Sequence, residues 1–330
     1  MITVIGATGT IGRNVSEFLE EWGVDVARRD FRLEGAGHVD ARDPASLSAA
    51  LEGSDVVVNA ADYRLNLDVM WGALEAGAHY VDLGGLFHVT RAQLKLYDEF
   101  LAPELCAVLG LGSAPGKTNL LAAAAARRLG EDPVSMEIWA ATRDPAAADH
   151  PFPAPYSVQT LRDELQMQPV VLHEGGLDEV EPLSGAASRD FPAPVGRAEG
   201  IYTLHSELAT LPVSLSSLRE ASFRLCLSPG LLQKLLALEE GELPEPYTQS
   251  PESVAVHEVE VRAEGGATVV GRTVTRGGSA KSTSEPAARA AVELAEGRLG
   301  KPGVHPPEIA VDDPEAFLAL LDTEVSWVGP

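Results

Sequence analysis

The chain has 330 residues, more than the roughly 250–300 at which a single hydrophobic core stops growing, so we expect two domains. Its composition, with 45% hydrophobic and 22% charged residues, is that of an ordinary globular protein and excludes a disordered or fibrous chain. The formal net charge of −24 at pH 7 repels phosphate groups, so neither nucleic acid nor an anionic membrane surface is expected as a partner.

Only two cysteines occur, Cys106 and Cys226, and each lies in an apolar run. We therefore expect two buried thiols in a reducing compartment and no disulfide framework. The chain opens on an apolar run with no basic stretch ahead of it, and it has no uninterrupted apolar stretch of about 18 residues. These features predict a cytoplasmic protein that does not span a membrane.

Short apolar runs alternate with helical patterns along the first part of the chain, which is the rhythm of a parallel sheet. The apolar runs are 2–5, 24–28, 38–41, 55–60, 79–83 and 106–111, and the helical patterns are 11–22, 44–52, 67–76 and 90–100. The start of the second helix is well marked, because Asp43 can cap it and Pro44 lacks an N–H that would be unpaired anyway. An alanine-rich helix then follows Gly116 and ends at Gly130.

From Val134 onward, β-like runs are separated by turns rich in proline and glycine, which predicts an antiparallel or mixed sheet. These runs are 134–143, 170–172, 201–204, 257–266 and 267–275. Helical patterns at 286–296 and near 314–321 are too short for a third domain. We therefore predict an α/β protein: a Rossmann-type doubly wound parallel sheet in residues 1–130, completed by 286–330, and a second α/β (α+β) domain in 131–285.

The segment TVIGATGTIGRNV reads as a strand, a glycine turn and a helix, and a second strand follows at the spacing of a βαβ unit. In such a unit Gly6 permits the tight turn, Gly9 lets a diphosphate approach the backbone, and Gly12 lets helix and strand pack closely. The motif predicts binding of a dinucleotide, NADP or NAD. The other residues expected around the diphosphate are Thr8, Thr10 and Ile11.

The end of the second strand decides between the two cofactors, since an acidic residue there binds a ribose hydroxyl and an arginine binds a 2′-phosphate. Arg28 and Arg29 stand at this end and favour NADP. Asp30 would favour NAD if the strand runs one residue further. The two arginines can also be read as a solvated strand end.

Two further positions are candidates for contacts with the cofactor. Asp40 is placed to reach the adenine, and Asn59, Ala60 and Ala61 end an apolar run where the ribose next to the nicotinamide is expected. Ordinary strand-end chemistry is the alternative for both.

Two enzyme classes that share the glycine spelling are excluded by missing residues. Short-chain and extended dehydrogenases need a tyrosine with a lysine four residues on, and no tyrosine here has one. Semialdehyde and acyl-phosphate dehydrogenases need an exposed, activated cysteine, whereas Cys106 and Cys226 lie among apolar residues.

The chain resembles the saccharopine dehydrogenase and lysine 6-dehydrogenase family over nearly its whole length. The segments that carry the resemblance are GATGTIG, DVVVNAA, EAGAHYVDLGG, GLGSAPGKTNLLA, YSVQTLRDE, FPAPVGRAEGIYTLHSELATLP and GVHPPE. The resemblance implies a Rossmann domain completed by C-terminal residues and a second domain that binds substrate and forms a homodimer. It also implies reversible hydride transfer between NADP or NAD and the C–N bond of an amino acid or its imine conjugate.

Three residues in the segments that resemble the family are candidates for catalysis. Asp82 ends the HYVD segment and is the first candidate for moving a proton or binding the substrate amine, with capping of the next turn as the alternative. His205 titrates near neutrality and is the second candidate, unless it is a packed, hydrogen-bonded histidine. Lys117, in a Gly/Pro turn that opens a helix, can hold a substrate carboxylate, or is otherwise solvated.

The remaining histidines share no ligand spacing with each other or with acidic residues, so we predict no metal site. Two alternatives to an enzyme stay open. One is a sensor that binds NADP to regulate a protein contact without turnover, and the other is a relative that has lost catalysis.

Overall fold

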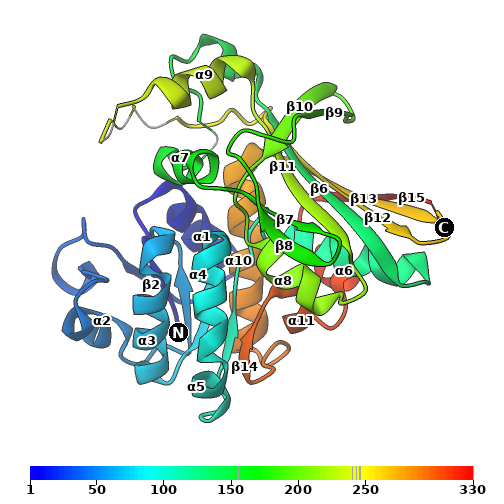
Figure 1. The fold of residues 1–330 in the computed structure, drawn as a ribbon. Helices are drawn as coiled ribbons and strands as arrows, with labels where there is room; N and C mark the ends of the chain where they lie inside the picture. Colours follow the sequence, from blue (N-terminus) through cyan, green and yellow to red (C-terminus); the bar gives the residue numbers. More distant parts are fainter. Residues whose placement is uncertain (155, 240, 243, 245–246, 330) are drawn as a thin grey trace. The chain divides into compact units, whose positions relative to one another are not determined.

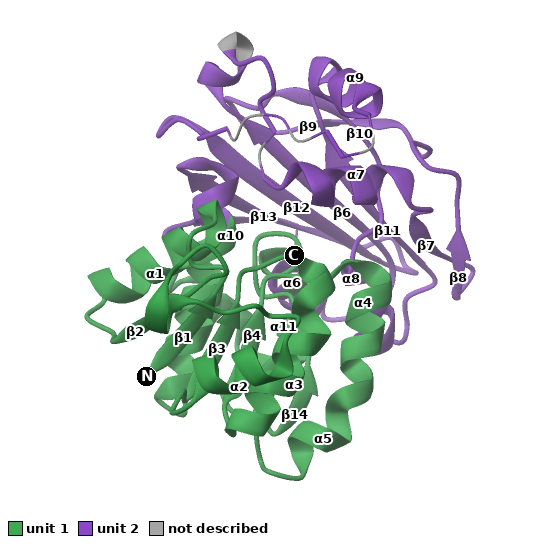
Figure 2. Cartoon of the chain, turned by 90° about the vertical axis from the view of Figure 1, so that its left-hand side faces the viewer, with its two compact units in different colours: residues 1–119, 283–321 green, residues 120–282, 322–330 purple. Residues whose placement is uncertain are grey.

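The computed structural model describes residues 1–154, 156–239, 241–242, 244 and 247–329. They form two compact units, each built from two separate segments of the chain (Figure 2). Unit 1 comprises Met1–Asn119 and Thr283–Leu321, and unit 2 comprises Leu120–Ser282 and Asp322–Pro330. The second segment of unit 1 therefore ends at Leu321, and the last residues of the chain belong to unit 2.

Unit 1 contains a six-stranded sheet in the described part of the chain, in the order β14-β5-β4-β3-β1-β2, and every neighbouring pair is parallel. The strands are β1 (Ile2–Ile5), β2 (Val26–Arg29), β3 (Val56–Asn59), β4 (His79–Asp82), β5 (Cys106–Val108) and β14 (Gly303–His305). This confirms the predicted doubly wound parallel sheet. The chain passes from β1 outward to β2 and then back past β1 to β3, so a topological switch point lies between β1 and β3.

Helices follow most strands of unit 1, as alternating patterns of period 2 and period 3.6 require. They are α1 (Thr10–Glu21), α2 (Pro44–Leu51), α3 (Asn66–Ala76), α4 (Leu86–Gln93), α5 (Tyr97–Leu101), α11 (Pro307–Ala310) and α12 (Pro314–Leu318), with 3-10 turns at Gly35–Gly37, Tyr63–Leu65 and Leu94–Leu96. One core cluster includes the fully buried Leu51, Met70, Tyr80 and Phe100. Side chains of the sheet and of α2, α3 and α5 thus share one apolar cluster.

The long helix α10 (Gly278–Ala295), orange in Figure 1, returns the chain from unit 2 to unit 1. Its unit 1 part lies beside α1, because Ser284 Oγ donates to the Ile11 carbonyl at 3.2 Å and the Arg289 guanidinium lies 4.1 Å from the Trp22 ring centroid. The prediction that this helix begins at Pro286 was wrong. The helix begins eight residues earlier and holds the proline inside it.

The apolar run 38–41 does not form the expected strand. Only His38 pairs, in an isolated parallel bridge with Asp30. Asp40 instead makes a turn, since its side chain accepts from the Arg42 backbone N–H at 3.0 Å, and Asp43 caps α2 by accepting from Ala45 N. Two aspartates that bond to the following backbone compete with strand pairing here.

Unit 2 is built on a nine-stranded sheet in the described residues, along the path β15-β13-β12-β6-β11-β10-β9, with β7 and β8 attached beside β11. The strands are β6 (Pro133–Arg143), β7 (Val170–His173), β8 (Gly176–Glu179), β9 (Ala187–Asp190), β10 (Arg197–Tyr202), β11 (Glu220–Cys226), β12 (Val254–Ala263), β13 (Thr268–Arg276) and β15 (Glu324–Val328). The pair β11–β6 is parallel and the other pairs are antiparallel. The sheet is therefore mixed, as predicted.

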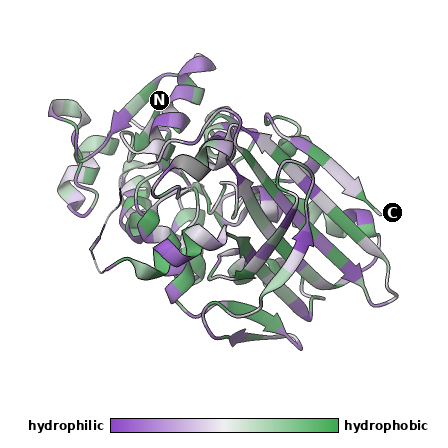
Figure 3. Cartoon of the chain, turned by 90° about the horizontal axis from the view of Figure 1, so that it is seen from above, coloured by the Kyte–Doolittle hydropathy of each residue, from purple (hydrophilic) through white to green (hydrophobic). Residues whose placement is uncertain are grey.

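Unit 2 also contains α6 (Lys117–Leu129), which begins in unit 1, together with α7 (Val158–Gln166), α8 (Glu207–Ser214), α9 (Pro229–Ala237) and a 3-10 turn at Pro145–Asp149. The strand β13 alternates buried and partly exposed residues, and Figure 3 shows such bands of hydrophobic and hydrophilic residues along the sheet. In the part of the chain that the structure describes, no helix combines the length and the apolar character needed to cross a membrane.

Candidate functional site

The loop between β1 and α1 is packed so closely that Gly6 and Gly12 have no room for side chains. Gly6 has φ +79°, and a Cβ there would lie 2.7 Å from the Ala61 nitrogen. A Cβ on Gly12 would lie 2.2 Å from the Gly6 oxygen, so helix and loop can approach only without side chains. These two contacts reproduce the turn and packing roles expected from the sequence.

Gly9 differs, because a Cβ there would meet only the Gly6 oxygen at 3.4 Å and would otherwise face open space. It is the N-cap of α1, and no side chain caps this helix end. Thr10, exposed, and Ile11, half-buried, start the helix. An uncapped helix N-terminus beside open space fits a diphosphate, so the residues present suit a dinucleotide.

Asp30 lies beside this loop. The register of the parallel strands β1 and β2 pairs Ile5 with Arg29, so the residues that come next, Gly6 and Asp30, are neighbours. Asp30 Oδ2 accepts from the Thr8 N–H at 3.1 Å and Oδ1 from the Arg32 N–H at 2.9 Å. Burial opposes ionisation, but these N–H groups outweigh it, and the pKa of Asp30 lies below its ordinary value.

The two arginines before Asp30 are bound elsewhere. Arg28 makes a double contact with Glu20 of α1, at 3.0 and 2.8 Å. Arg29 donates to the Ala50 carbonyl at 3.1 Å and is half-buried. β2 ends at Arg29, and the next residue, Asp30, forms only an isolated bridge with His38. A contact of Asp30 with a cofactor ribose stays a prediction.

At the end of β3 the side chain of Asn59 is turned inward. It is 2% exposed, donates to Asn66 Oδ1 at 2.9 Å and accepts from the Ala61 N–H at 3.2 Å. The backbone of Ala60 and Ala61 faces Gly6, because their backbone atoms are the ones nearest to a Cβ built on that glycine. Asp40 is partly exposed and paired with Arg42 at 2.9 Å. Their contacts with a cofactor stay predictions.

Asp82 is the centre of a buried polar network. Its Oδ2 accepts from Gln93 at 2.6 Å, Tyr80 at 3.1 Å and Asn66 at 3.2 Å. Its Oδ1 accepts from the backbone N–H groups of Gly110 at 2.6 Å and Gly84 at 2.9 Å. The residue is 1% exposed, and burial raises its pKa despite these five donors. The bond from the Gly84 N–H is the contact expected of the alternative role, capping of the next turn, and a role in moving a proton or binding an amine stays a prediction.

Lys117, the first residue of α6, is 1% exposed, so the alternative of a solvated lysine was wrong. Its backbone N–H donates to the Gly112 carbonyl at 3.1 Å. A role in holding a carboxylate stays a prediction.

His205 lies in a second buried polar cluster, within unit 2. Its Nδ1 is 3.2 Å from Glu207 Oε2, and its Nε2 is 3.7 Å from Glu164 Oε1. The ring stacks on Phe223 of β11, with centroids 3.6 Å apart. Glu164 of α7 also accepts from the Tyr156 hydroxyl at 2.5 Å. We call Tyr156, Glu164, His205 and Glu207 the histidine cluster.

Electrostatics keep the imidazole of this cluster charged. Burial alone would lower the pKa, but the carboxylates of Glu207 and Glu164 outweigh burial and raise the pKa of His205 to about 10. Among the described residues, His205 Nε2 and two hydroxyls of its sequence neighbours, Thr203 Oγ1 and Ser206 Oγ, are buried and lack a hydrogen-bond partner. Because buried polar groups are normally satisfied, the cluster has the character of a binding site for a polar ligand.

Sequence reasoning found His205 and missed its partners. Glu207 follows two residues later and Glu164 lies in YSVQTLRDE, so both stand within segments that carried the resemblance. Glu164 is brought close to His205 by the hydrogen bond from the Leu204 N–H to the Glu164 carbonyl at 3.2 Å, which joins residues forty positions apart and which no local pattern signals.

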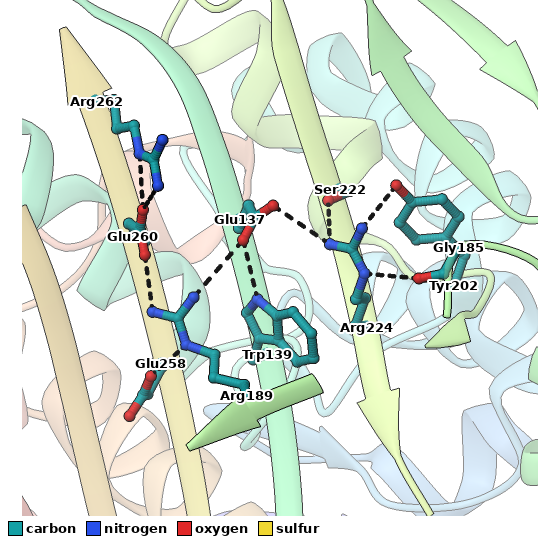
Figure 4. A network of polar contacts seen from close by, with 10 residues as sticks. All are labelled: Glu137, Trp139, Gly185, Arg189, Tyr202, Ser222, Arg224, Glu258, Glu260 and Arg262. Atoms are coloured by element: carbon teal, nitrogen blue, oxygen red, sulfur yellow. Dashed lines mark hydrogen bonds and ion pairs between the residues drawn. The ribbon is translucent and has the colours of Figure 1, made fainter. Parts of the chain in front are cut away.

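A different network in unit 2 joins the β9–β10 hairpin to the sheet (Figure 4). Arg189 of β9 contacts Glu258 at 2.5 Å and Glu260 at 2.9 Å, both on β12. Arg224 of β11 donates to the Tyr202 hydroxyl and the Gly185 carbonyl, both at 2.9 Å. Each guanidinium is held by several acceptors, so this network is structural. Among the described residues, no three His, Cys, Asp or Glu side chains gather as metal ligands would.

Comparison with known proteins agrees with this geometry. Residues 2–108 match the family model described as the saccharopine dehydrogenase NADP binding domain. Saccharopine dehydrogenase (L-Glu forming) from Saccharomyces cerevisiae matches with a TM-score of 0.70 at 14% identity, over 99% of both chains. Homospermidine synthase from Legionella pneumophila, solved with NAD, matches with a TM-score of 0.73 at 12% identity, over 100% of this chain and 91% of that one. Residues 2–108 are therefore similar to the dinucleotide-binding domain of saccharopine dehydrogenase, and the chain shares the fold of saccharopine dehydrogenase over 99% of its length.

Proposed function

We propose that this protein is an oxidoreductase that moves a hydride between a nicotinamide dinucleotide and the C–N bond of an amino acid or its imine conjugate. The observation that carries the proposal is the glycine cradle at the switch point of the unit 1 sheet, with Asp30 beside it. The nicotinamide would supply the hydride acceptor or donor. The names of both matching structures refer to secondary amines, which supports a C–N substrate.

We infer that NAD is preferred over NADP, in contrast to what the arginines of the sequence favour. Asp30 is ionised and lies at the ribose end of the strand, where a carboxylate accepts from the 2′-hydroxyl and repels a 2′-phosphate. Arg28 and Arg29, the residues expected to pair with that phosphate, are engaged by Glu20 and Ala50.

The histidine cluster supports proton transfer to and from an amine. An imidazolium with a pKa of about 10 matches an alkyl ammonium, whose pKa is about 10.4, so a proton can pass either way with little driving force. The two flanking carboxylates outnumber the single imidazolium, so a positively charged ligand group would bind at the carboxylates and not at His205 Nε2, which is itself a cationic donor. In the reductive direction, hydride transfer to an imine carbon produces such an amine.

Fluorescence titration with NADH and NADPH tests the cofactor part of the proposal. Wild-type protein should bind NADH at least tenfold more tightly, and Asp30→Asn should reduce this preference by removing the charge. Arg197→Gln, which alters an exposed charge pair with Asp190 in unit 2, is the matched control and should leave the preference unchanged. Tighter binding of NADPH by the wild type would contradict the role given to Asp30.

A sensor that binds the dinucleotide without turnover remains the alternative, and the homodimer expected from the resemblance stays a prediction. Turnover with an amine or imine substrate separates the enzyme from the sensor. Size-exclusion chromatography with light scattering tests the dimer.

A further inference from the structure

Phe31 follows Asp30 directly and is an unusually exposed aromatic residue, at 61% of its surface. It stands in a tight turn, because the Leu33 N–H donates to the Asp30 carbonyl at 3.2 Å. The Asp30 carboxylate also accepts from the Arg32 N–H at 2.9 Å, so the backbone on both sides of Phe31 is fixed. A ring held out into solvent by a rigid turn has an apolar face to offer a ligand.

Arg32 supports this ring from one side. Its guanidinium lies 4.7 Å from the Phe31 centroid, within the range of a cation–π contact. Unlike Arg28 and Arg29, whose side chains bond to Glu20 and to the Ala50 carbonyl, Arg32 places its charge on an aromatic face. The pair Phe31 and Arg32 therefore forms a flat surface one residue beyond the ribose position.

We propose that Phe31 is the platform on which the adenine ring of the dinucleotide stacks. The inference rests on the proposed function, because it takes Asp30 as the acceptor of the adenosine ribose. Adenine is joined to that ribose by one bond, so a side chain adjacent to Asp30 is within its reach. Stacking on an aromatic ring uses the π-face that the base presents in any orientation of its hydrogen-bonding edge.

Calorimetric titration of Phe31→Ala with NADH, ADP-ribose and reduced nicotinamide mononucleotide tests the proposal. Binding of NADH and of ADP-ribose should weaken about tenfold, the loss expected for one base–aromatic stack, while the mononucleotide, which lacks adenine, should bind as before. Phe31→Tyr keeps the ring and should restore wild-type affinity. Trp71→Ala removes another exposed aromatic residue of unit 1, 43% exposed, and should change none of the three affinities.

Equal binding of ADP-ribose by wild type and Phe31→Ala would overturn the adenine platform and leave the proposed function standing. An equal loss for all three ligands would also overturn it, because the substitution would then act on the site as a whole. Failure of the wild type to bind any dinucleotide would overturn the proposed function and this inference with it.

Discussion

At the scale of single residues, we expect Gly12 to be needed for folding and Gly9 to be needed for binding of the dinucleotide. A Cβ on Gly12 would overlap the Gly6 oxygen at 2.2 Å, whereas one on Gly9 would lie at an ordinary 3.4 Å from the same atom. Gly12→Ala should therefore destabilise the protein by about 1–3 kcal/mol or more. Gly9→Ala should keep its stability within about 0.5 kcal/mol and lose at least tenfold in affinity for NADH.

Thermal unfolding without cofactor, followed by NADH titration, measures both effects. The φ of −68° at Gly9 suits alanine, so backbone strain does not confuse the comparison. Unchanged NADH affinity in Gly9→Ala would mean that the diphosphate does not approach this residue.

Asp82 has a buried carboxylate that accepts five hydrogen bonds, so stability and turnover measured together test whether its role is structural or catalytic. Asp82→Asn replaces an acceptor of five hydrogen bonds by a group that must place two N–H donors among them. We expect a loss of about 1–3 kcal/mol in the free energy of unfolding by urea. Asp40→Asn, on the exposed pair with Arg42, should leave the free energy of unfolding nearly unchanged. Lost turnover with unchanged stability would make Asp82 a reactive group instead.

The histidine cluster predicts a specific pH dependence of stability. The pKa of His205 is raised to about 10 in the folded protein, above the unfolded value of about 6.5. Its contribution is therefore fully present below about pH 6.5 and is lost as the pH rises towards 10. Urea unfolding between pH 6.5 and 10 should show a steeper loss of stability in the wild type than in His205→Gln.

His88→Gln, at an exposed position, is the control and should follow the wild type. Removing His205 takes the imidazolium away from two buried carboxylates, so the variant should also be less stable at pH 7 by about 3–5 kcal/mol. Parallel pH profiles for wild type and His205→Gln would show that His205 does not carry the charge that its neighbours imply.

At the scale of elements, the N-terminus of α10 depends on a residue distant in sequence. Gln249 Oε1 accepts from the Ser279 N–H at 2.7 Å and the Ala280 N–H at 3.3 Å, which caps the helix. Gln249→Ala should lower the free energy of unfolding by about 0.5–2 kcal/mol. Gln233→Ala, at an exposed position on α9, should be nearly neutral. Equal stability of the two variants would show that the cap contributes nothing.

The same helix shows where sequence patterns succeed and where they fail. The unit β1–α1–β2 follows from local signals, because its glycines, apolar strand and amphipathic helix are contiguous. The start of α10 does not, since its cap comes from Gln249, and Pro286 suggests a helix start that the structure does not use. The run 38–41 looked like a strand by hydropathy, but Asp40 and Asp43 bond to the backbone that follows each of them.

At the scale of the whole molecule, the two sheets and the dinucleotide loop could be predicted from the sequence. The sequence did not show which segments of the chain make up each unit. Strand β15 comes from the C-terminus and pairs with β13 of unit 2, which only long-range pairing specifies. The histidine cluster likewise joins Glu164 of α7 to residues before and at the start of α8. From the net charge of −24 we predict that anionic macromolecules bind poorly, so small-molecule chemistry is the function to test first.

The most direct test of hydride transfer is to follow the absorbance of reduced nicotinamide while the protein is given NADH with paired amines and carbonyl compounds. The pairs are lysine with 2-oxoglutarate, glutamate with aminoadipate semialdehyde, and polyamine precursors, and NADPH is tested in parallel. We predict that one pair oxidises NADH, and that the reaction reverses when the amine product is given with NAD. Tight NADH binding with every pair silent would favour the sensor, and failure to bind either cofactor would contradict the proposed function altogether.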